Sequence, residues 1–346
     1  MNIIVLCGGI SPERDVSLAS GANICSALIT SGHRAKRLDL FFGVKQKYKN
    51  FDEFYEDDPP TFKHSEKIKD SAPNTDELYK RRGTDYSSIG ENVIELCSMA
   101  DIVFIALHGN EGEDGKLQAL FDLYRIKYTG SDYFSCSMAM EKHVSKNILT
   151  NEKIRVPLGI SLKKSDSFNN KIPMPCVVKP CSCGSSIGVS IVHSESELKD
   201  ALHIAFKYSE RVIIEEYIKG REFAVGILNG VALPPIEIIP KDGFFDYKNK
   251  YSAEKTLEVC PANIDDDLQK RMMDIALRAN DALCLTVYSR VDFIVSNNLE
   301  IVCLEVNALP GMTEASLLPK EARAARIQYT ELCNKIVNLS LERFQS

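Results

Sequence analysis

The stretch at residues 288–313 constrains the fold most, because two runs of β-branched and apolar residues flank a polar turn at residues 296–299. This pattern predicts a β-hairpin. Pairing across that turn would place Arg290 opposite Glu305 and Asp292 opposite Cys303. Alternation along the strands then predicts a core face formed by Val291, Phe293, Val295, Val302, Leu304 and Val306. The other face would contain Arg290, Asp292, Ile294, Ile301, Cys303, Glu305 and Asn307.

The polar face carries groups that suit a phosphate-bound cation. In the predicted register Asp292 and Glu305 are diagonal neighbours with Cα atoms about 7–8 Å apart, so their carboxylates can converge on one ion. Asn307 adds an amide oxygen, and such oxygen ligands suit Mg²⁺ bound to substrate phosphates. Arg290 suits a phosphate or a developing oxyanion. The alternative is a hairpin with one solvated face, but apolar neighbours such as Ile294 argue that something covers it.

Length and charge exclude several classes of protein. With 346 residues, the chain can form two or three domains. The net charge of -6 provides no basic surface, so we expect no nucleic-acid partner. No apolar run approaches the roughly 20 residues of a membrane span. Residues 1–6 lack the charged segment of a signal peptide. We therefore expect a cytoplasmic protein without a membrane partner.

The eleven cysteines are an odd number and lie mostly in apolar segments, which indicates reduced, buried thiols. Cys181 and Cys183 differ, because they lie in a glycine-containing loop. A C-x-C pair is weak evidence for zinc, and no second pair of cysteines or histidines is spaced to complete a site. We therefore do not expect zinc at this loop.

The N-terminal segment predicts an α/β unit, since a strand at residues 2–7 leads through two glycines into a helical pattern. The helix N-terminus offers free N–H groups to an anion, but the dinucleotide fingerprint G-x-G-x-x-G is absent. Glu13, at the turn, either faces a cleft or caps the helix. A second strand is expected at residues 34–40. Residues 41–90 predict a long irregular insertion with one or two short strands.

A third strand, at residues 101–107, ends in His108 and a run of acids. Open α/β sheets bind ligands at this end of their strands, so these side chains are candidates for a site. The alternative is a polar loop with an isolated histidine. One long helix is expected at residues 135–150, with Lys142 and Lys146 on its solvated side.

The middle of the chain predicts a loop that approaches phosphates. Strands are expected at residues 177–179, 189–192 and 212–218. Between the first two, residues 180–188 are small, polar and glycine-containing, and Lys179 could reach the same ligand as a point charge. Turn formation alone also explains such a loop.

Several motifs occur in a fixed order. They are G-G-x-S-x-E-R-x-V-S at 8–17, L-H-G with G-E-x-G at 107–115, Y-T-G-S at 128–131, M-x-K at 140–142, V-V-K-P with G-S-S-x-G at 177–188, G-x-E-F at 220–223, D-Y with K-Y at 246–251, R-x-D at 290–292 and L-E-x-N-x-x-P-G-M-T at 304–313. With this series the chain resembles the D-alanine–D-alanine ligases of the ATP-grasp family, over nearly all of its length except residues 41–90.

The resemblance implies an α/β protein, α+β in the ATP-binding part, with ATP-grasp architecture and an N-terminal parallel-sheet domain. It implies an N-terminal substrate domain at residues 1–134, a central ATP-grasp subdomain at 135–223 and a C-terminal subdomain at 224–346 with the metal and substrate site. It also implies a cytoplasmic homodimer that makes D-alanyl-D-alanine for peptidoglycan precursor synthesis.

The implied reaction uses ATP to phosphorylate the carboxylate of one D-alanine, and the amine of a second D-alanine then attacks the acylphosphate. Two Mg²⁺ ions, or Mn²⁺, are implied. The alternatives are a D-alanine–D-serine or other amino-acid ligase of this fold, and a non-catalytic ATP-binding relative. The Lys250–Tyr251 pair resembles ligases that make the dipeptide.

The resemblance assigns ATP to Lys142, Lys179, Ser186, Glu215, Tyr217, Ile218, Glu222 and Lys250. It assigns the metal ions to Asp292, Glu305 and Asn307. It assigns the catalytic and substrate-binding roles to Glu13, His108, Ser185, Tyr251, Arg290, Gly311, Ser316 and Leu317. The sequence departs from the family at Ser182 and Cys183, where an arginine and a glutamate are usual. The substitution removes two charges near the phosphates, and we expect it to alter loop closure or ATP affinity.

Overall fold

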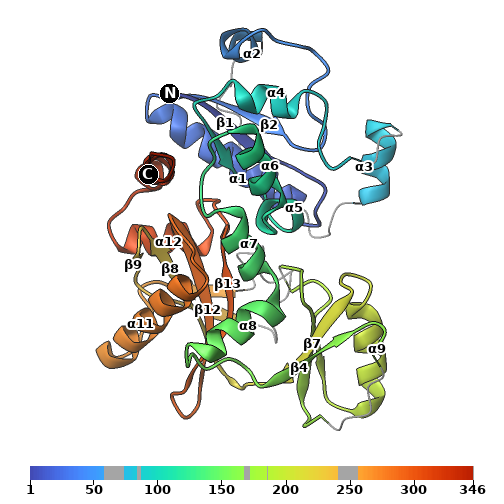
Figure 1. Cartoon of the computed structure of the whole chain (residues 1–346). Coiled ribbons are helices and arrows are strands. Elements are labelled where there is room, and N and C mark those ends of the chain that lie inside the picture. The colour runs from blue at the N-terminus through green and yellow to red at the C-terminus, as the bar shows by residue number, and fades with distance from the viewer. Residues whose placement is uncertain (58–73, 84–86, 167–171, 185, 241–255, 346) are drawn as a thin grey trace.

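The computed structural model describes residues 1–57, 74–83, 87–166, 172–184, 186–240 and 256–345. Its strands form three sheets, one near the N-terminus, one in the middle of the chain and one near the C-terminus. Figure 1 shows the N-terminal sheet at one end of the molecule, with α7 (Tyr133–Met140) and α8 (Lys142–Asn151) between it and the middle sheet. This mixed α/β architecture agrees with the predicted fold class.

The N-terminal sheet is parallel, with the strand order β2-β1-β3. Its strands are β1 (Asn2–Cys7), β2 (Arg34–Asp39) and β3 (Ile102–Ile105), all of which were predicted. The run from Ile3 to Leu6 is fully buried, as expected for a strand with both faces covered. One core joins α1 (Arg14–Thr30) to the C-terminal helix α13 (Tyr329–Arg343), so the chain returns to its first domain.

The described part of the insertion at residues 41–90 contains helices and none of the short strands expected for this region. In its described part the chain forms two helices, α2 (Phe51–Asp57) and α3 (Thr75–Arg82), besides an isolated bridge from Gly43 to Glu91. Phe51 lies one helical turn before a second buried aromatic residue, and both pack on the N-terminal core. A short helix, α4 (Val93–Ser98), then leads into β3.

The expected long helix at residues 135–150 is two helices, and this correction changes the site. After α5 (Asn110–Glu113) and α6 (Lys116–Tyr124), α7 ends at Glu141, whose extended backbone (ψ 94°) also begins α8. The break turns the first two turns of α8 inward. Lys142 and Lys146 are consequently only 7% and 5% exposed, so the expectation that they are solvated is wrong.

The middle sheet is antiparallel, with the order β4-β7-β5-β6. Its strands are β4 (Gly159–Lys163), β5 (Cys176–Pro180), β6 (Ser190–Val192) and β7 (Arg211–Glu216). A single helix, α9 (Glu195–Ala205), packs on this sheet and completes a small core. The edge strand β4 was not predicted, because it is largely exposed and lacks an apolar run.

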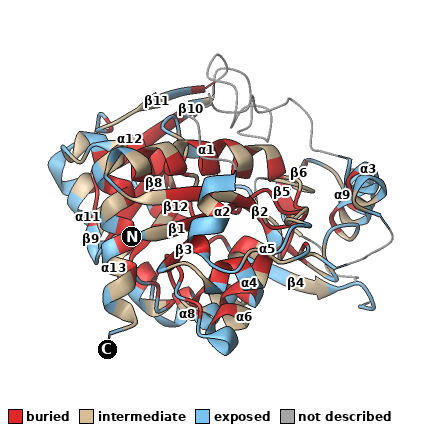
Figure 2. Cartoon of the chain, turned by 90° about the horizontal axis from the view of Figure 1, so that it is seen from above, coloured by how far each residue is buried: buried red, intermediate tan, exposed pale blue. Residues whose placement is uncertain are grey.

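The C-terminal sheet has the path order β11-β10-β8-β12-β13, with β9 also paired to β8. Its strands are β8 (Gly220–Leu228), β9 (Val231–Ala232), β10 (Ile236–Pro240), β11 (Thr256–Val259), β12 (Tyr288–Ser296) and β13 (Ile301–Asn307). Helix α11 (Asp266–Ala282) packs with the main core of this sheet, and α12 (Leu317–Ala324) packs on β8 and β10. Figure 2 shows buried residues along the central strands β8 and β12.

The predicted hairpin is β12–β13, but its register differs from the prediction. The turn contains three residues, because Ser296 pairs with Glu300 and Leu299 adopts a left-handed conformation (φ 60°). A β-bulge between Asp292 and Phe293 shifts the pairing again. As a result Asp292 lies directly opposite Glu305, and Arg290 lies opposite Asn307.

The bulge also changes which face several residues occupy. Ile301 and Cys303, expected on the polar face, belong to the core with Phe293. Ile294 pairs with Val302, and Leu304, expected in the core, lines a cavity beside Ile294. The polar residues themselves stay on one face. Their direct pairing places the Cβ atoms of Asp292 and Glu305 about 4.5–5.5 Å apart.

Candidate active site

A cavity lies between the middle and C-terminal sheets. It is lined by Lys142, Pro157, Val177, Lys179, Cys183, Ser186, Val189, Glu215, Glu216, Tyr217, Ile218, Glu222, Asp292, Ile294, Leu304 and Glu305. The described residues assigned to ATP by resemblance are all in this lining, together with two of the three assigned to metal. Pro157, Val177, Ile218 and Leu304 supply apolar surface, and the charged groups come from α8, β5, β7, β8 and the hairpin.

Two lysines hold one buried carboxylate on the cavity wall. Glu215 of β7 is 2% exposed and forms ion pairs with Lys179 of β5 and, at 2.9 Å, with Lys146 of α8. Burial would raise the pKa of the Glu215 carboxyl, but the charges of the two lysines outweigh burial and lower the pKa below its ordinary value. Glu215 is therefore ionised. Burial lowers the pKa of Lys146, and the charge of Glu215 opposes that effect.

The hairpin brings together the acids assigned to metal and two competing cations. Arg290 donates two hydrogen bonds to Asp292, at 2.6 and 2.8 Å, and the Asn307 amide donates another at 3.0 Å. Lys142 Nζ lies 3.2 Å from Glu305 and donates to the Cys183 carbonyl at 2.7 Å. Two directly paired carboxylates and an amide oxygen form a hard, oxygen-only donor set, which fits Mg²⁺. Burial lowers the pKa of Lys142, but the charge of Glu305 outweighs it and raises the pKa overall.

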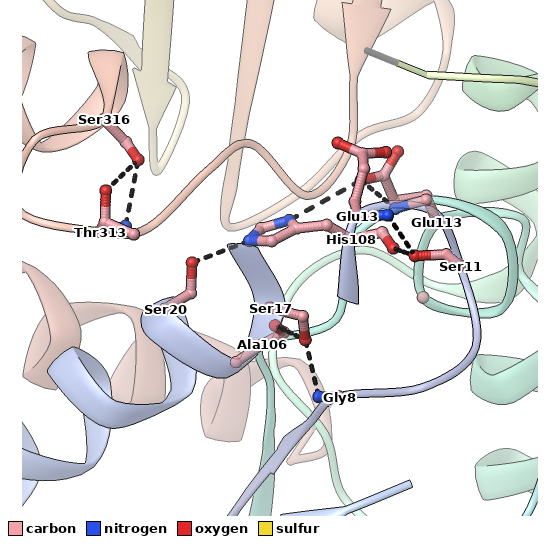
Figure 3. Close-up of polar contacts among 12 residues, drawn as sticks. Gly8, Ser11, Glu13, Ser17, Ser20, Ala106, His108, Glu113, Thr313 and Ser316 are labelled. Atoms are coloured by element: carbon pink, nitrogen blue, oxygen red, sulfur yellow. Dashed lines mark hydrogen bonds and ion pairs between the residues drawn. The ribbon is translucent and has the colours of Figure 1, made fainter. Parts of the chain in front are cut away.

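A second group of polar residues lies at the C-terminal end of β3 (Figure 3). His108 is buried, its Nε2 lies 2.9 Å from Ser20 Oγ, and its Nδ1 lies 3.8 Å from Glu113. The Glu113 carboxylate also accepts from the backbone N–H of Gly109 at 3.0 Å. His108 therefore belongs to an ordered network and is not an isolated loop histidine.

Glu13 connects this network to residues 180–188, the loop predicted to approach phosphates and called the phosphate-approaching loop below. Glu13 stands at the start of α1, is only 6% exposed and makes no side-chain capping bond, so it does not fill the capping role that was one of its two predicted alternatives. A Cβ atom added to Gly109 would lie 2.9 Å from Glu13 Oε2, and one added to Gly184 would lie 3.2 Å from the same atom. The left-handed backbone of Gly109 (φ 70°) favours glycine at that position, and both glycines let their loops approach one carboxylate closely.

The segment after β13 brings Gly311 against the start of α12. Ser316 precedes α12 and accepts a hydrogen bond from the Thr313 N–H at 3.1 Å, as Figure 3 shows. A Cβ added to Gly311 would meet Ser316 Oγ at 3.0 Å. Leu317 is the first residue of α12 and is buried on the C-terminal sheet. Ser185, Lys250 and Tyr251, the other residues assigned by resemblance, lie outside the described residues.

Comparison with known proteins identifies the family. Residues 2–131 match the family model of the D-ala D-ala ligase N-terminus, and residues 158–338 match that of the D-ala D-ala ligase C-terminus. The chain belongs to the D-alanine–D-alanine ligase family.

Curated relatives in this family are similar over their whole length. A D-alanine–D-alanine ligase of Pediococcus pentosaceus is 43% identical over 97% of each chain. One of Lacticaseibacillus casei is 38% identical over 99% of this chain and 97% of its own. The crystal structure of the Bacillus anthracis D-alanine–D-alanine ligase complexed with ATP superimposes with a TM-score of 0.77 at 31% identity, covering 100% of this chain and 99% of that one. These findings confirm the predicted resemblance and fold.

Sequence reasoning missed the burial of two ionisable residues in this family member. Lys146 was read as solvated, and the break before α8 that buries it carries neither glycine nor proline. Glu321 of α12 is fully buried and accepts from the Gly226 N–H at 2.7 Å. Gly226 is the direct partner of Arg290 in the sheet, so Glu321 lies near the arginine of the site. No spacing in the sequence indicates this contact.

Proposed function

We propose that the chain joins two D-alanines into D-alanyl-D-alanine at the expense of ATP. Membership of the D-alanine–D-alanine ligase family supports this reaction. The observation that carries it is the arrangement of Lys142, Lys179, Asp292 and Glu305 around one cavity. Arg290 is held next to that cavity by its ion pair with Asp292. This arrangement suits phosphoryl transfer by positioning and charge rather than by covalent chemistry.

ATP binds in the cavity with its phosphates at the lysines. Lys142 and Lys179 contact the phosphates, and the loop with Ser185 and Ser186 closes over them. Adenine and ribose lie against Glu215, Tyr217, Ile218 and Glu222, and Lys250 contributes from its loop. Asp292, Glu305 and Asn307 would hold the magnesium ions, which would neutralise charge on the transferring phosphoryl group.

The first D-alanine lies near His108, with its ammonium against Glu13. Its carboxylate oxygen attacks the γ-phosphorus of ATP, the bond from that phosphorus to the bridging oxygen breaks, and ADP and an acylphosphate form. The narrow space that Gly109 and Gly184 leave at Glu13 supports this placement. We propose that Ser185 and Tyr251 complete the network around Glu13.

The second D-alanine lies at the start of α12, where Ser316 and Leu317 meet its carboxylate. Its amine, having lost a proton, attacks the acyl carbon and gives a tetrahedral oxyanion. Arg290 and the Gly311 N–H stabilise that oxyanion, and the carbon–oxygen bond to phosphate then breaks to leave the peptide. A free helix N-terminus suits a carboxylate, which supports this placement.

The reaction is tested by incubating the protein with ATP, Mg²⁺ and D-alanine and measuring both phosphate release and dipeptide. We expect Arg290→Ala to retain ATP binding while turnover falls by orders of magnitude. Arg221→Ala is the matched control, because Arg221 is also a bidentate carboxylate partner in this sheet, on Glu237 and away from the cavity. Absence of both products from the unaltered chain would contradict the proposal.

D-serine is the alternative second substrate, and kcat/KM values for D-alanine and D-serine separate the two activities. We further propose a division at residues 1–134, 135–223 and 224–346, supported by one sheet falling mainly in each part. A cytoplasmic homodimer is also proposed from the family; light scattering during gel filtration tests the dimer. No described helix is long and apolar enough to cross a bilayer.

A further inference from the structure

A mixed cluster of potential metal ligands lies behind the phosphate-approaching loop. Glu141 stands at the break between α7 and α8, His143 is the second residue of α8, and Cys181 follows β5. One carboxylate oxygen, one imidazole nitrogen and the Sγ atom lie within 4.8 Å of one another. Cys181 lies about forty positions after Glu141 and His143 in the chain, which is why the C-x-C spacing alone gave no reason to expect a site.

Backbone contacts hold the two segments together independently of any ion. The Lys142 N–H donates to the Cys181 carbonyl at 3.0 Å, and the Cys181 N–H donates to the Arg211 carbonyl at 3.0 Å. Cys181 is fully buried, so its sulfur has a fixed position relative to the start of α8. The cluster is therefore preorganised, which limits the entropy lost when a cation binds.

His143 supplies the second observation. Its Nδ1 atom is shielded from solvent and makes no hydrogen bond to any residue within the described ranges. The nearest acid is Glu141, whose Oε2 lies 3.5 Å away, beyond good hydrogen-bond geometry. The imidazole nitrogen and the carboxylate therefore face each other without a hydrogen bond between them, and a cation bound to both would satisfy the shielded nitrogen.

We propose that Glu141, His143 and Cys181 bind a zinc-class divalent cation, with water in the fourth position. Thiolate, imidazole and carboxylate together suit Zn²⁺, whereas the oxygen-only set on the hairpin suits Mg²⁺. Ligand atoms around tetrahedral zinc are about 3.3–3.8 Å apart, so side-chain adjustments of about 1 Å complete the site. The thiol loses its proton on binding, and the charges of Glu141 and Cys181 then balance the cation.

The site adjoins the machinery of the proposed ligase without sharing its ligands. Lys142 stands between Glu141 and His143 in the chain, and its Nζ reaches both Cys183 and Glu305. A cation at Cys181 ties the root of the phosphate-approaching loop to the start of α8. This consequence rests on the proposed function: Zn²⁺ should slow turnover of the unaltered chain and have less effect on Cys181→Ser.

Binding itself is tested with Co²⁺ on nucleotide-free protein, because a thiolate ligand gives cobalt a charge-transfer band that oxygen ligands do not. We expect this band in the unaltered chain, its displacement by Zn²⁺, its loss in Cys181→Ser and its weakening in His143→Gln. Cys183→Ser is the matched control, since that sulfur lies in the same loop against the Tyr208 carbonyl, and it should keep the band. Thermal unfolding in chelator checks that each variant is folded.

Two results overturn the proposal: no thiolate band at saturating Co²⁺, or a band that survives in both Cys181→Ser and His143→Gln. The second variant covers the case in which Cys181→Ser does not fold. Because these spectra need no ATP or D-alanine, a failure here is distinct from a failure of the ligase activity.

Discussion

Glu321 offers the sharpest test of the energetics, because a carboxyl group with no exposure depends on its few neighbours. The Gly226 N–H donates to one oxygen, while the other oxygen has no hydrogen-bond partner among the described residues. Burial raises the pKa of Glu321 to about 8; the Gly226 N–H and the charge of Arg290 oppose this, and Asp292 adds to it. The carboxyl is therefore neutral in the folded protein at pH 7.

The magnitude follows from the difference between folded and unfolded states. The ordinary pKa is 4.5 and the folded one about 8, so the folded protein keeps a proton that the unfolded chain releases. Between these pH values the unfolded state binds fewer protons, and stability falls as pH rises. At about 1.4 kcal/mol per pH unit, the free energy of unfolding falls by about 5 kcal/mol between pH 4.5 and pH 8. Below pH 4.5 Glu321 is protonated in both states and causes no such fall.

Glu321→Gln removes this titration, and urea unfolding of both proteins between pH 4.5 and pH 8 measures it. At the acidic end the variant should be less stable by about 1–3 kcal/mol, because a buried amide N–H₂ lacks an acceptor. The stability of the variant relative to the unaltered chain should then rise by about 5 kcal/mol toward pH 8. Glu331→Gln, which makes the same change on an exposed face of α13, should show no such trend.

Parallel pH profiles for the unaltered chain and Glu321→Gln would refute the reasoning. They would show that Glu321 is ionised when folded, and hence that the attraction of Arg290 exceeds the cost of burial. If Glu331→Gln showed the same change in stability with pH relative to the unaltered chain, the effect would come from the change in net charge and not from the buried carboxyl.

Three further predictions concern packing, the lysine cluster and ion loading. Lys146→Met should lower the free energy of unfolding by about 3–5 kcal/mol, since it removes one partner of buried Glu215; an unchanged urea midpoint would show that Lys179 suffices. Gly21→Ala should cost about 1–3 kcal/mol in the same assay, because the added Cβ would lie 2.6 Å from Cys7 Cβ; unaltered stability would contradict the packing. Calorimetry should find Mn²⁺ binding at Asp292 weak without ATP and strong with it, and tight binding of Mn²⁺ alone would contradict this.

The sequence predicted those elements whose burial is complete. The run at Ile3–Leu6 and the hairpin strands are apolar enough to identify without any knowledge of neighbours. The hairpin register could not be predicted, because it depends on the left-handed backbone of Leu299, a residue type that rarely adopts it. Because side chains alternate between the two faces of a strand, a one-residue error in register moves each side chain to the opposite face. For this reason Cys303 was predicted on the polar face although it lies in the core.

The site residues also differ in whether local sequence or distant contacts determine their surroundings. Asp292 and Glu305 were predictable because they interrupt apolar strands on the same face. The burial of Lys146 was not, since it depends on Glu215, which is contributed by a strand about seventy residues later. Local pattern identifies a strand with charges on it, whereas ion pairs between distant segments require the tertiary fold.

The ion pairs of the site also explain why cation and nucleotide should load together. In the described structure Arg290 is paired with Asp292, and Lys142 with Glu305, so the acids assigned to metal already have cationic partners. A magnesium ion alone must displace these partners and would leave Lys142 and Arg290 unpaired in a desolvated site, which is costly. A triphosphate supplies new anionic partners for the released cations, and magnesium supplies new partners for the released carboxylates. Each ligand therefore offsets the cost that the other creates, which is positive coupling between two sites without any change of fold.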